Sequence, residues 1–301
     1  MRVVYLGHNR RGITCLEALH SSPFEVVYAV GLEGESGWYS SILDTAKSLG
    51  IPCSAERQPN DETFLKKVRK LEPDLVVMCG YSKIVGKAFR QIPHHGCINL
   101  HASKLPFYRG AAPLNWALIK GEKEIGLSIY QVDGGIDTGP IIAQATFEVT
   151  PDMTIKEVLE KSLELYPPLL LEVCDQFAAG TITSHPQNLD EGSYFTKRYP
   201  RDGEFSWESS SDQEIYNLVR ALTKPYPGAY FNYQGQRVYV WAASLEKRNY
   251  RGVPGRVATR QGGGVVVIAK NRGLRLEQVQ VEEKPALPAR DVFKRVGEDL
   301  V

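Results

Sequence analysis

The spacing of apolar and polar positions divides the chain into two parts. Over residues 1–180, short apolar runs alternate with longer segments whose apolar residues recur every three or four positions. This alternation is typical of a parallel sheet whose strands are joined by helices. We expect strands at residues 2–6, 25–30, 51–53, 74–78, 97–100, 124–131 and 141–149, and helices at 13–22, 40–49, 61–71, 86–91, 112–120 and 154–177.

The pattern changes in the last third of the chain. A polar, turn-rich segment is followed by a helix at 211–222 and then by short β-type runs separated by glycines, at 229–233, 237–245, 255–269 and 274–282. Several short strands in so few residues favour a small barrel or sandwich. We therefore predict an α/β domain over residues 1–180, a linker over 181–206 and a β domain over 207–301.

Composition narrows the class of protein. The formal charge is +1, from 36 basic and 35 acidic residues, which gives no signature of a dedicated nucleic-acid binder. The five cysteines show no metal-type spacing, so we expect reduced thiols and no metal site. No apolar run approaches the roughly 20 residues of a membrane span, and the strand-like start lacks a signal-peptide layout. We expect a cytoplasmic protein without a membrane partner.

Three segments follow the carboxyl ends of predicted strands, where doubly wound sheets bind ligands. They are Gly7–Gly12, Cys79–Ser82 and Asn99–His101. Gly7 and Gly12 are spaced GxxxxG, and no acidic residue closes the second strand, so a tight turn is favoured over a dinucleotide site.

Polar chemistry gathers around the strand that ends at residues 99–101. Asn99 and His101 lie two apart, so their side chains share one face of that strand, and Asp137 follows on the glycine-rich segment 133–140. An amide donor, a base and a carboxylate are the groups that acyl transfer needs. Judged by residue types alone, a structural interpretation is equally favoured. In it, Asn99 caps a turn, His101 is a hydrogen-bonded polar residue and Asp137 is an acidic residue of a turn. A covalent hydrolase is not favoured, because no nucleophile elbow is present.

The longer run around these residues carries a family resemblance. INLHASKLPFYRGAAPLNWALIKGEKEIGLSIYQVDGGIDTGPII, at residues 98–142, closely resembles the signature of the 10-formyltetrahydrofolate-dependent formyltransferases, which include methionyl-tRNA and nucleotide-sugar enzymes. PALPARDVFKR, at 285–295, resembles the end of their second domain. The resemblance implies a Rossmann-like doubly wound parallel sheet, an OB-like β-barrel and N10-formyltetrahydrofolate as formyl donor.

The resemblance also assigns roles to residues. Asn99 and His101 would hold the formyl oxygen, while Asp137 would tune His101 and help to collect the amine proton. Ser103 and Arg109 match positions near the amine substrate, and Arg109 suits a phosphate or carboxylate. The pocket for the donor would be formed by Cys79, Gly80, Tyr81, Asp133, Gly134, Gly135 and Ile136.

The acceptor is predicted from weaker signals. The stretch 31–39 is short and acidic where the tRNA enzymes carry a basic insertion, so we expect a nucleotide-linked amino sugar and no nucleic acid. Residues 198–207 and 217–241 resemble the domain acting on UDP-4-amino-4-deoxy-arabinose, although Ala111 replaces an arginine of that pattern. Lys197, Arg198 and Arg201 are candidates for the nucleotide phosphates, with solvated surface charges an equal alternative.

These signals place the predicted activity in surface-glycan biosynthesis. Three rival functions stay open: methionyl-tRNA formylation, hydrolysis of the formyl donor, and a non-catalytic ligand-binding module. The sequence does not identify the particular sugar or the oligomeric state.

Overall fold

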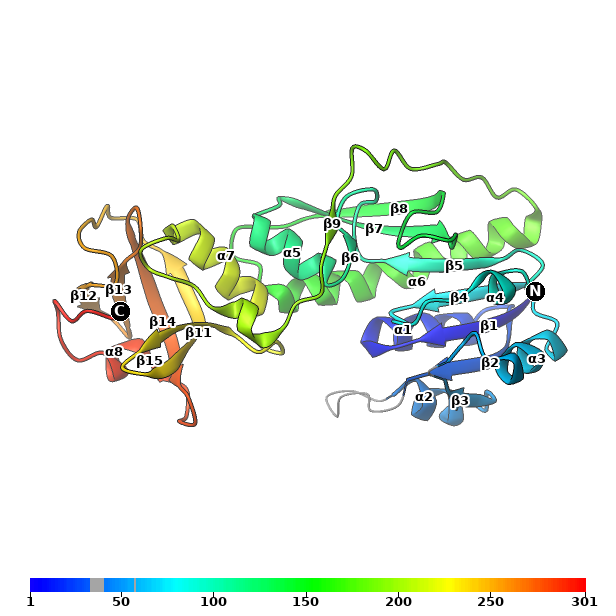
Figure 1. Cartoon of the computed structure of the whole chain (residues 1–301), viewed down its shortest axis with the longest axis horizontal. Helices are drawn as coiled ribbons and strands as arrows, with labels where there is room; N and C mark the ends of the chain where they lie inside the picture. The colour runs from blue at the N-terminus through cyan, green and yellow to red at the C-terminus, as the bar shows by residue number, and fades with distance from the viewer. Residues whose placement is uncertain (33–40, 57) are drawn as a thin grey trace. The chain divides into compact units, whose positions relative to one another are not determined.

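The computed structural model describes residues 1–32, 41–56 and 58–301 (Figure 1). Most of the acidic stretch 31–39, on which the prediction against nucleic acid rests, lies outside the described residues. The chain forms two compact units. Unit 1 holds Met1–Pro113, Glu124–Glu148 and Glu160–Phe195, and unit 2 holds Leu114–Lys123, Val149–Leu159 and Thr196–Val301. Two short segments of the predicted first domain thus belong to unit 2, and the predicted bounds 1–180, 181–206 and 207–301 stay a prediction.

Unit 1 is built on a seven-stranded sheet in its described residues, with strand order β3-β2-β1-β4-β5-β7-β8. The strands are β1 (Arg2–Gly7), β2 (Glu25–Gly31), β3 (Cys53–Ala55), β4 (Leu75–Cys79), β5 (Cys97–His101), β7 (Glu124–Gln131) and β8 (Ile141–Glu148).

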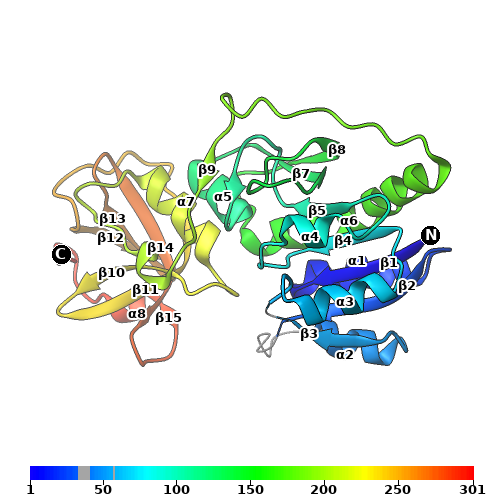
Figure 2. The same cartoon turned by 45° about the vertical axis from the view of Figure 1, so that its right-hand side comes forward.

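The predicted α/β class is confirmed, with one refinement of strand direction. Strands β1 to β5 pair in parallel, whereas β7 runs antiparallel to β5, and β8 runs antiparallel to β7 (Figure 2). Antiparallel neighbours need only a short connection, and the loop of residues 132–140 is sufficient to join β7 to β8. The sheet is therefore mixed, and that loop leaves β7 beside the amino end of β5 and carries Asp137, whose carboxylate reaches His101.

Helices form where the apolar spacing places them. They are α1 (Asn9–His20), α2 (Ile42–Ser48), α3 (Glu62–Lys70) and α4 (Lys87–Arg90). The side chains of Ser41 and Asp61 accept hydrogen bonds from backbone N–H groups in the first turns of α2 and α3, which fixes where these helices begin.

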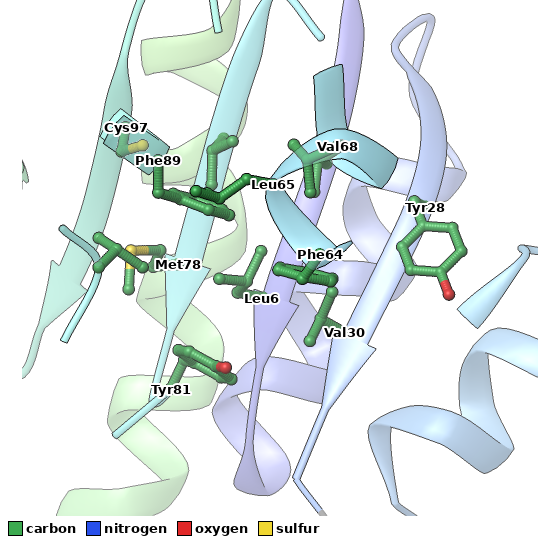
Figure 3. Packing of buried hydrophobic residues seen from close by; sticks show 13 residues of the cluster. Leu6, Tyr28, Val30, Phe64, Leu65, Val68, Met78, Tyr81, Phe89 and Cys97 are labelled. Atoms are coloured by element: carbon green, nitrogen blue, oxygen red, sulfur yellow. The ribbon is translucent and has the colours of Figure 1, made fainter. Parts of the chain in front are cut away.

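The core of unit 1 follows the two-residue period of its strands. Val4 and Leu6 of β1 lie on one face, where α3 contributes Phe64, Leu65 and Val68 (Figure 3). Tyr5 points to the other face and donates to the carbonyl of Gly12 in α1. Because both faces are buried, β1 and β4 read as continuous apolar runs.

One long helix contains two prolines. Pro167 and Pro168 lie inside α6 (Ile155–Ala179), which continues through both prolines. Within the part of the chain that the structure describes, no helix is both long and apolar enough to cross a membrane.

Unit 2 contains a six-stranded antiparallel sheet in the described residues, which confirms a separate C-terminal β domain. The side chains of Phe205, Trp207, Phe231 and Phe293 pack together on this unit. Its elements are α5 (Pro113–Lys120), η1 (Pro200–Gly203), α7 (Asp212–Leu222), β10 (Ala229–Tyr233), β11 (Gln236–Leu245), β12 (Val257–Gln261), β13 (Gly264–Ile268), β14 (Gly273–Val281), β15 (Leu287–Pro288) and α8 (Ala289–Val292).

Candidate active site

A cavity of about 470 Å³ opens in unit 1 where β4 and β5 end. Asn99, His101 and Asp137 all line it, so the structure brings the three predicted catalytic residues together. Their joint position follows from the parallel pairing of β4 with β5 and from the loop that returns after β7. Other residues that line the cavity are Asn9, Arg11, Gly80, Tyr81, Lys83, Ile84, Ala111, Tyr130, Asp133, Gly135, Ile136 and Tyr194.

His101 lies between a carbonyl and a carboxylate. Its Nε2 is 2.8 Å from the carbonyl oxygen of Tyr108, and its Nδ1 is 3.5 Å from Oδ2 of Asp137. A carbonyl only accepts hydrogen bonds, so Nε2 carries a proton in this arrangement. Nδ1 is then the ring atom that can take up a second proton, next to a carboxylate that stabilises the imidazolium.

The Asp137 carboxylate is held by two donors. The backbone N–H of Gly110 donates to Oδ2 at 2.7 Å, and the Tyr130 hydroxyl donates to Oδ1 at 2.7 Å. The Asp137 backbone has a φ of 55°, in the left-handed region, and Tyr108 and Ala112 share that region with φ values of 57° and 53°. Such conformations are uncommon outside glycine and gather at functional sites.

Asn99 faces Tyr130 across the β5–β7 pair. The two residues are direct partners in the register, and the Asn99 Nδ2 donates to the Tyr130 hydroxyl at 3.0 Å. Burial raises the pKa of the Tyr130 phenol well above its ordinary value, and the neighbouring Asp137 charge adds to this effect. The phenol is therefore protonated throughout the neutral range.

The residues predicted for the donor pocket divide into two groups. Gly80, Tyr81, Asp133, Gly135 and Ile136 line the cavity, whereas Cys79 and Gly134 are not among its lining residues. Gly80 has a φ of 74°, and a Cβ there would lie 2.7 Å from the carbonyl oxygen of His8, so the backbone needs glycine at this turn. The Tyr81 hydroxyl donates to the Glu56 carbonyl, and burial raises its pKa.

The loop that carries Asp137 is stabilised by hydrogen bonds to the Asp133 carboxylate. Oδ1 of Asp133 accepts from the backbone N–H of Gly135 at 2.9 Å and from the Thr138 hydroxyl at 2.7 Å. These bonds shape the loop that carries Ile136, whose side chain is 47% exposed although it lines the cavity.

Two residues predicted to contact the acceptor, Ser103 and Arg109, are not among the residues that line the cavity. Ser103 is buried, and its hydroxyl donates to the Phe107 carbonyl at 2.7 Å, so it is not among the residues that line the cavity. Arg109 donates from Nη2 to the Leu189 carbonyl at 3.1 Å, and its buried Nε has no hydrogen-bond partner among the described residues.

Two further predicted contacts lie in unit 2. The Arg198 guanidinium stacks 4.6 Å from the ring centroid of Trp116, and burial lowers its pKa. The Lys197 ammonium lies 5.5 Å from the ring centroid of Tyr199. Cations beside aromatic rings form here a surface that combines charge with stacking area.

Two family models match the chain in succession. The model described as formyl transferase matches residues 26–174, and the model of the formyl transferase C-terminal domain matches residues 198–297. Together they span well over half of the chain. The chain belongs to the formyl transferase family.

Curated relatives of this formyltransferase match it along nearly its whole length. The methionyl-tRNA formyltransferase of Alkaliphilus oremlandii is 31% identical over 297 residues, covering 97% of this chain and 95% of the relative. The methionyl-tRNA formyltransferase of Geobacter metallireducens is 34% identical over 246 residues, covering 82% of this chain and 78% of the relative. The predicted exclusion of nucleic acid is therefore not supported.

Solved structures share the fold of this formyltransferase. An N-formyltransferase from Helicobacter canadensis, in complex with folinic acid and dTDP-3-aminofucose, has a TM-score of 0.72 at 18% identity and covers 91% of this chain and 97% of its own. HypX from Aquifex aeolicus, in complex with tetrahydrofolic acid, has a TM-score of 0.65 at 19% identity and covers 100% of this chain and 49% of its own.

The sequence did not reveal every residue around the formyltransferase site. Tyr130 was predicted only as part of a strand, because its importance depends on the register of β5 and β7. The segment before Phe195 was predicted as linker, yet β6 (Arg109–Gly110) pairs in parallel with β9 (Tyr194–Phe195), and Gln187 donates to the carbonyls of Asp137 and Gly139. No pattern in a turn-rich segment reports such long-range contacts.

No metal site emerges from the described residues. Within them, no group of three or more histidine, cysteine, aspartate or glutamate side chains is placed to hold a metal ion.

Proposed function

We propose that the chain transfers a formyl group directly from N10-formyltetrahydrofolate to a primary amine. The observation that supports this most strongly is the convergence of Asn99, His101 and Asp137 on one cavity of a formyl transferase fold. The amine nitrogen attacks the formyl carbon and forms a tetrahedral oxyanion. The bond from that carbon to N10 of the folate then breaks, and the proton lost by the amine is returned to N10.

Each side chain has a role in these steps. Asn99 donates an N–H to the developing oxyanion, since its amide lies at the end of β5 on the cavity wall. Asp137 and Nδ1 of His101 collect the amine proton, because Nδ1 lies 3.5 Å from the carboxylate and Nε2 already donates to Tyr108. The predicted contact of His101 with the formyl oxygen stays a prediction and requires Nε2 to leave that carbonyl.

The cavity fits a folate donor in two respects. Gly80 lines the cavity and has no side chain, so a heterocycle can approach the backbone there. Ile84 and Ile136 are 70% and 47% exposed and both line the cavity, so they offer apolar surface to an aromatic ring.

For the acceptor, methionyl-tRNA is the first candidate. Relatives with that name align over 97% of this chain at 31% identity, and the near-complete coverage includes both domains. In this function, Lys197, Arg198 and Arg201 would contact tRNA phosphates, and the exposed Tyr199 ring would add a stacking surface.

A nucleotide-linked amino sugar is the second candidate. The specific observation in its favour is residues 31–39, which contain Glu33 and Glu35 and no lysine or arginine. Like charges at this point would oppose a phosphate backbone. In this function, Arg109 would bind a phosphate of the nucleotide.

One assay separates the candidates. Purified protein and N10-formyltetrahydrofolate are incubated with methionyl-tRNA, with a panel of nucleotide amino sugars, or without acceptor, and release of tetrahydrofolate is followed. Formylation of methionyl-tRNA with a steep salt dependence supports the first candidate, and acceptor-dependent turnover with one sugar supports the second. Equal release without any acceptor would identify a hydrolase and refute formyl transfer.

A further inference from the structure

A buried tyrosine connects two of the three residues on the cavity. The Tyr130 hydroxyl lies 3.0 Å from Nδ2 of Asn99 and 2.7 Å from Oδ1 of Asp137. Tyr130 is 4% exposed, and its position opposite Asn99 is set by the antiparallel pairing of β7 with β5. Neither family resemblance nor residue pattern assigns it a role.

The direction of both hydrogen bonds follows from the number of protons available. A phenol has one O–H to donate, and an ionised carboxylate can only accept, so the Tyr130 proton points to Asp137. The phenol oxygen can then only accept from Asn99, and this requires the NH₂ end of the amide to face Tyr130. A flipped amide would place its carbonyl oxygen against an oxygen that has no proton left to give.

We propose that Tyr130 is a positioning residue that uses the Asp137 carboxylate to fix the orientation of the Asn99 amide. With one N–H of Asn99 bound to Tyr130, the other N–H is held in a set direction on the cavity wall, where the oxyanion forms. This inference rests on the proposed function. The phenol has no competing ionisation in the neutral range, because burial and the Asp137 charge both keep it protonated.

A purely packing role predicts a different outcome. The Tyr130 ring is part of the sheet core, and replacing Tyr130 by phenylalanine keeps that ring while removing only the oxygen. Tyr166 supplies a matched control, since it is 1% exposed and its hydroxyl has no hydrogen-bond partner among the described residues. Removal of a buried hydroxyl is therefore common to both variants, and loss of the Asn99 and Asp137 contacts is specific to one.

The first test is steady-state kinetics with the acceptor identified by the assay above. Tyr130→Phe is expected to lower kcat about tenfold and to leave both KM values within about twofold, since the lost bonds act on the oxyanion donor and not on binding. Tyr166→Phe is expected to keep kcat within about twofold. A Tyr130→Phe protein with wild-type kcat contradicts the inference, and so does one that fails to fold, because the hydroxyl would then serve the fold.

The second test is a double-mutant cycle with Asn99→Ala. If Tyr130 acts through Asn99, then Tyr130→Phe changes the residual kcat of Asn99→Ala by less than about twofold. A further tenfold loss in that background shows independent action and overturns the inference. A different result refutes the proposed function: full turnover by the Asn99→Ala single variant.

Discussion

The backbone N–H of Gly110 donates to Oδ2 of Asp137 at 2.7 Å, between residues 27 positions apart in the chain. Gly110 has a φ of 93°, and a Cβ there would lie 2.3 Å from the Phe195 carbonyl oxygen. A side chain at this position would thus displace the donor from Asp137. The geometry of the carboxylate depends on the turn that follows Arg109 as much as on its own loop.

Loss of either His101 or Asp137 is expected to stop turnover. His101→Ala removes the ring that takes up the amine proton, and Asp137→Ala removes the charge beside it, so kcat should fall by about 10²–10³ or more. Binding of tetrahydrofolate, measured by fluorescence titration, should stay within about threefold. His20→Ala, at an exposed helix end, is the control, and near-normal turnover in either site variant would remove these residues from the mechanism.

Arg109 is expected to affect the acceptor more than the donor. Its side chain is partly exposed, so the guanidinium can reach an oxygen of the acceptor. Arg109→Ala should raise KM for the acceptor about tenfold and change KM for the donor less than twofold, since a charge-assisted bond contributes about 1.5–3 kcal/mol. Arg248→Ala, at an exposed position, is the control, and equal changes in both KM values would contradict the assignment.

The five thiols are expected to react at very different rates. Cys15, Cys79, Cys97 and Cys174 are each at most 1% exposed, whereas Cys53 is partly exposed. Burial raises the pKa of Cys97 and of Cys174 to about 12, so both stay protonated and unreactive at pH 8.

The measurement is titration with a disulfide reagent at pH 8. One fast thiol per native chain is expected, and all five should react after unfolding. Cys53→Ser should abolish the fast phase. A fast phase of two or more thiols would show that one of the buried cysteines is accessible. For Cys79, only burial prevents the reaction, because the hydrogen bond from Cys15 lowers the pKa of its thiol.

Gly139 is expected to tolerate no side chain. A Cβ at this position would lie 1.7 Å from the carbonyl oxygen of Gln131, at the end of β7, so the loop that carries Asp137 would have to move. Gly139→Ala should lower the free energy of unfolding by about 3 kcal/mol, measured by urea denaturation.

The matched control for Gly139→Ala is Gly263→Ala. A Cβ at Gly263 meets no atom within 4 Å, so that variant should stay within about 0.5 kcal/mol of the wild type. Equal free energies of unfolding for the two variants would contradict the prediction, because the loop would then accommodate a Cβ at Gly139 at no cost in stability.

The sequence carried enough information to place the main site residues. Asn99 and His101 share a strand face because they lie two apart, and parallel strands bring their carboxyl ends to one edge, so the cavity wall was predictable from local pattern. Ser103 shows the limit of that logic, because the backbone turn that buries it depends on the Phe107 carbonyl.

Long-range pairing explains what the sequence did not reveal. The reversal of β7 relative to β5 depends on the connection of residues 102–123, whose course local apolar spacing does not report. Tyr130 gains its two polar partners only through that reversal, and Gln187 gains its contacts only once β8 is in place. Residue type and local spacing do not predict which residues distant in the sequence will be in contact.

The bridge between Ile141 and His185 has a practical consequence for dissecting the chain. It covers the start of β8, which is one of the two edge strands of the sheet in unit 1. A fragment cut at residue 180 would lose this cover together with the β9 partner of β6, and bare strand edges recruit other chains. Such a fragment should aggregate more readily than one extended through Phe195, which keeps the bridge at Ile141 and the β6–β9 pair.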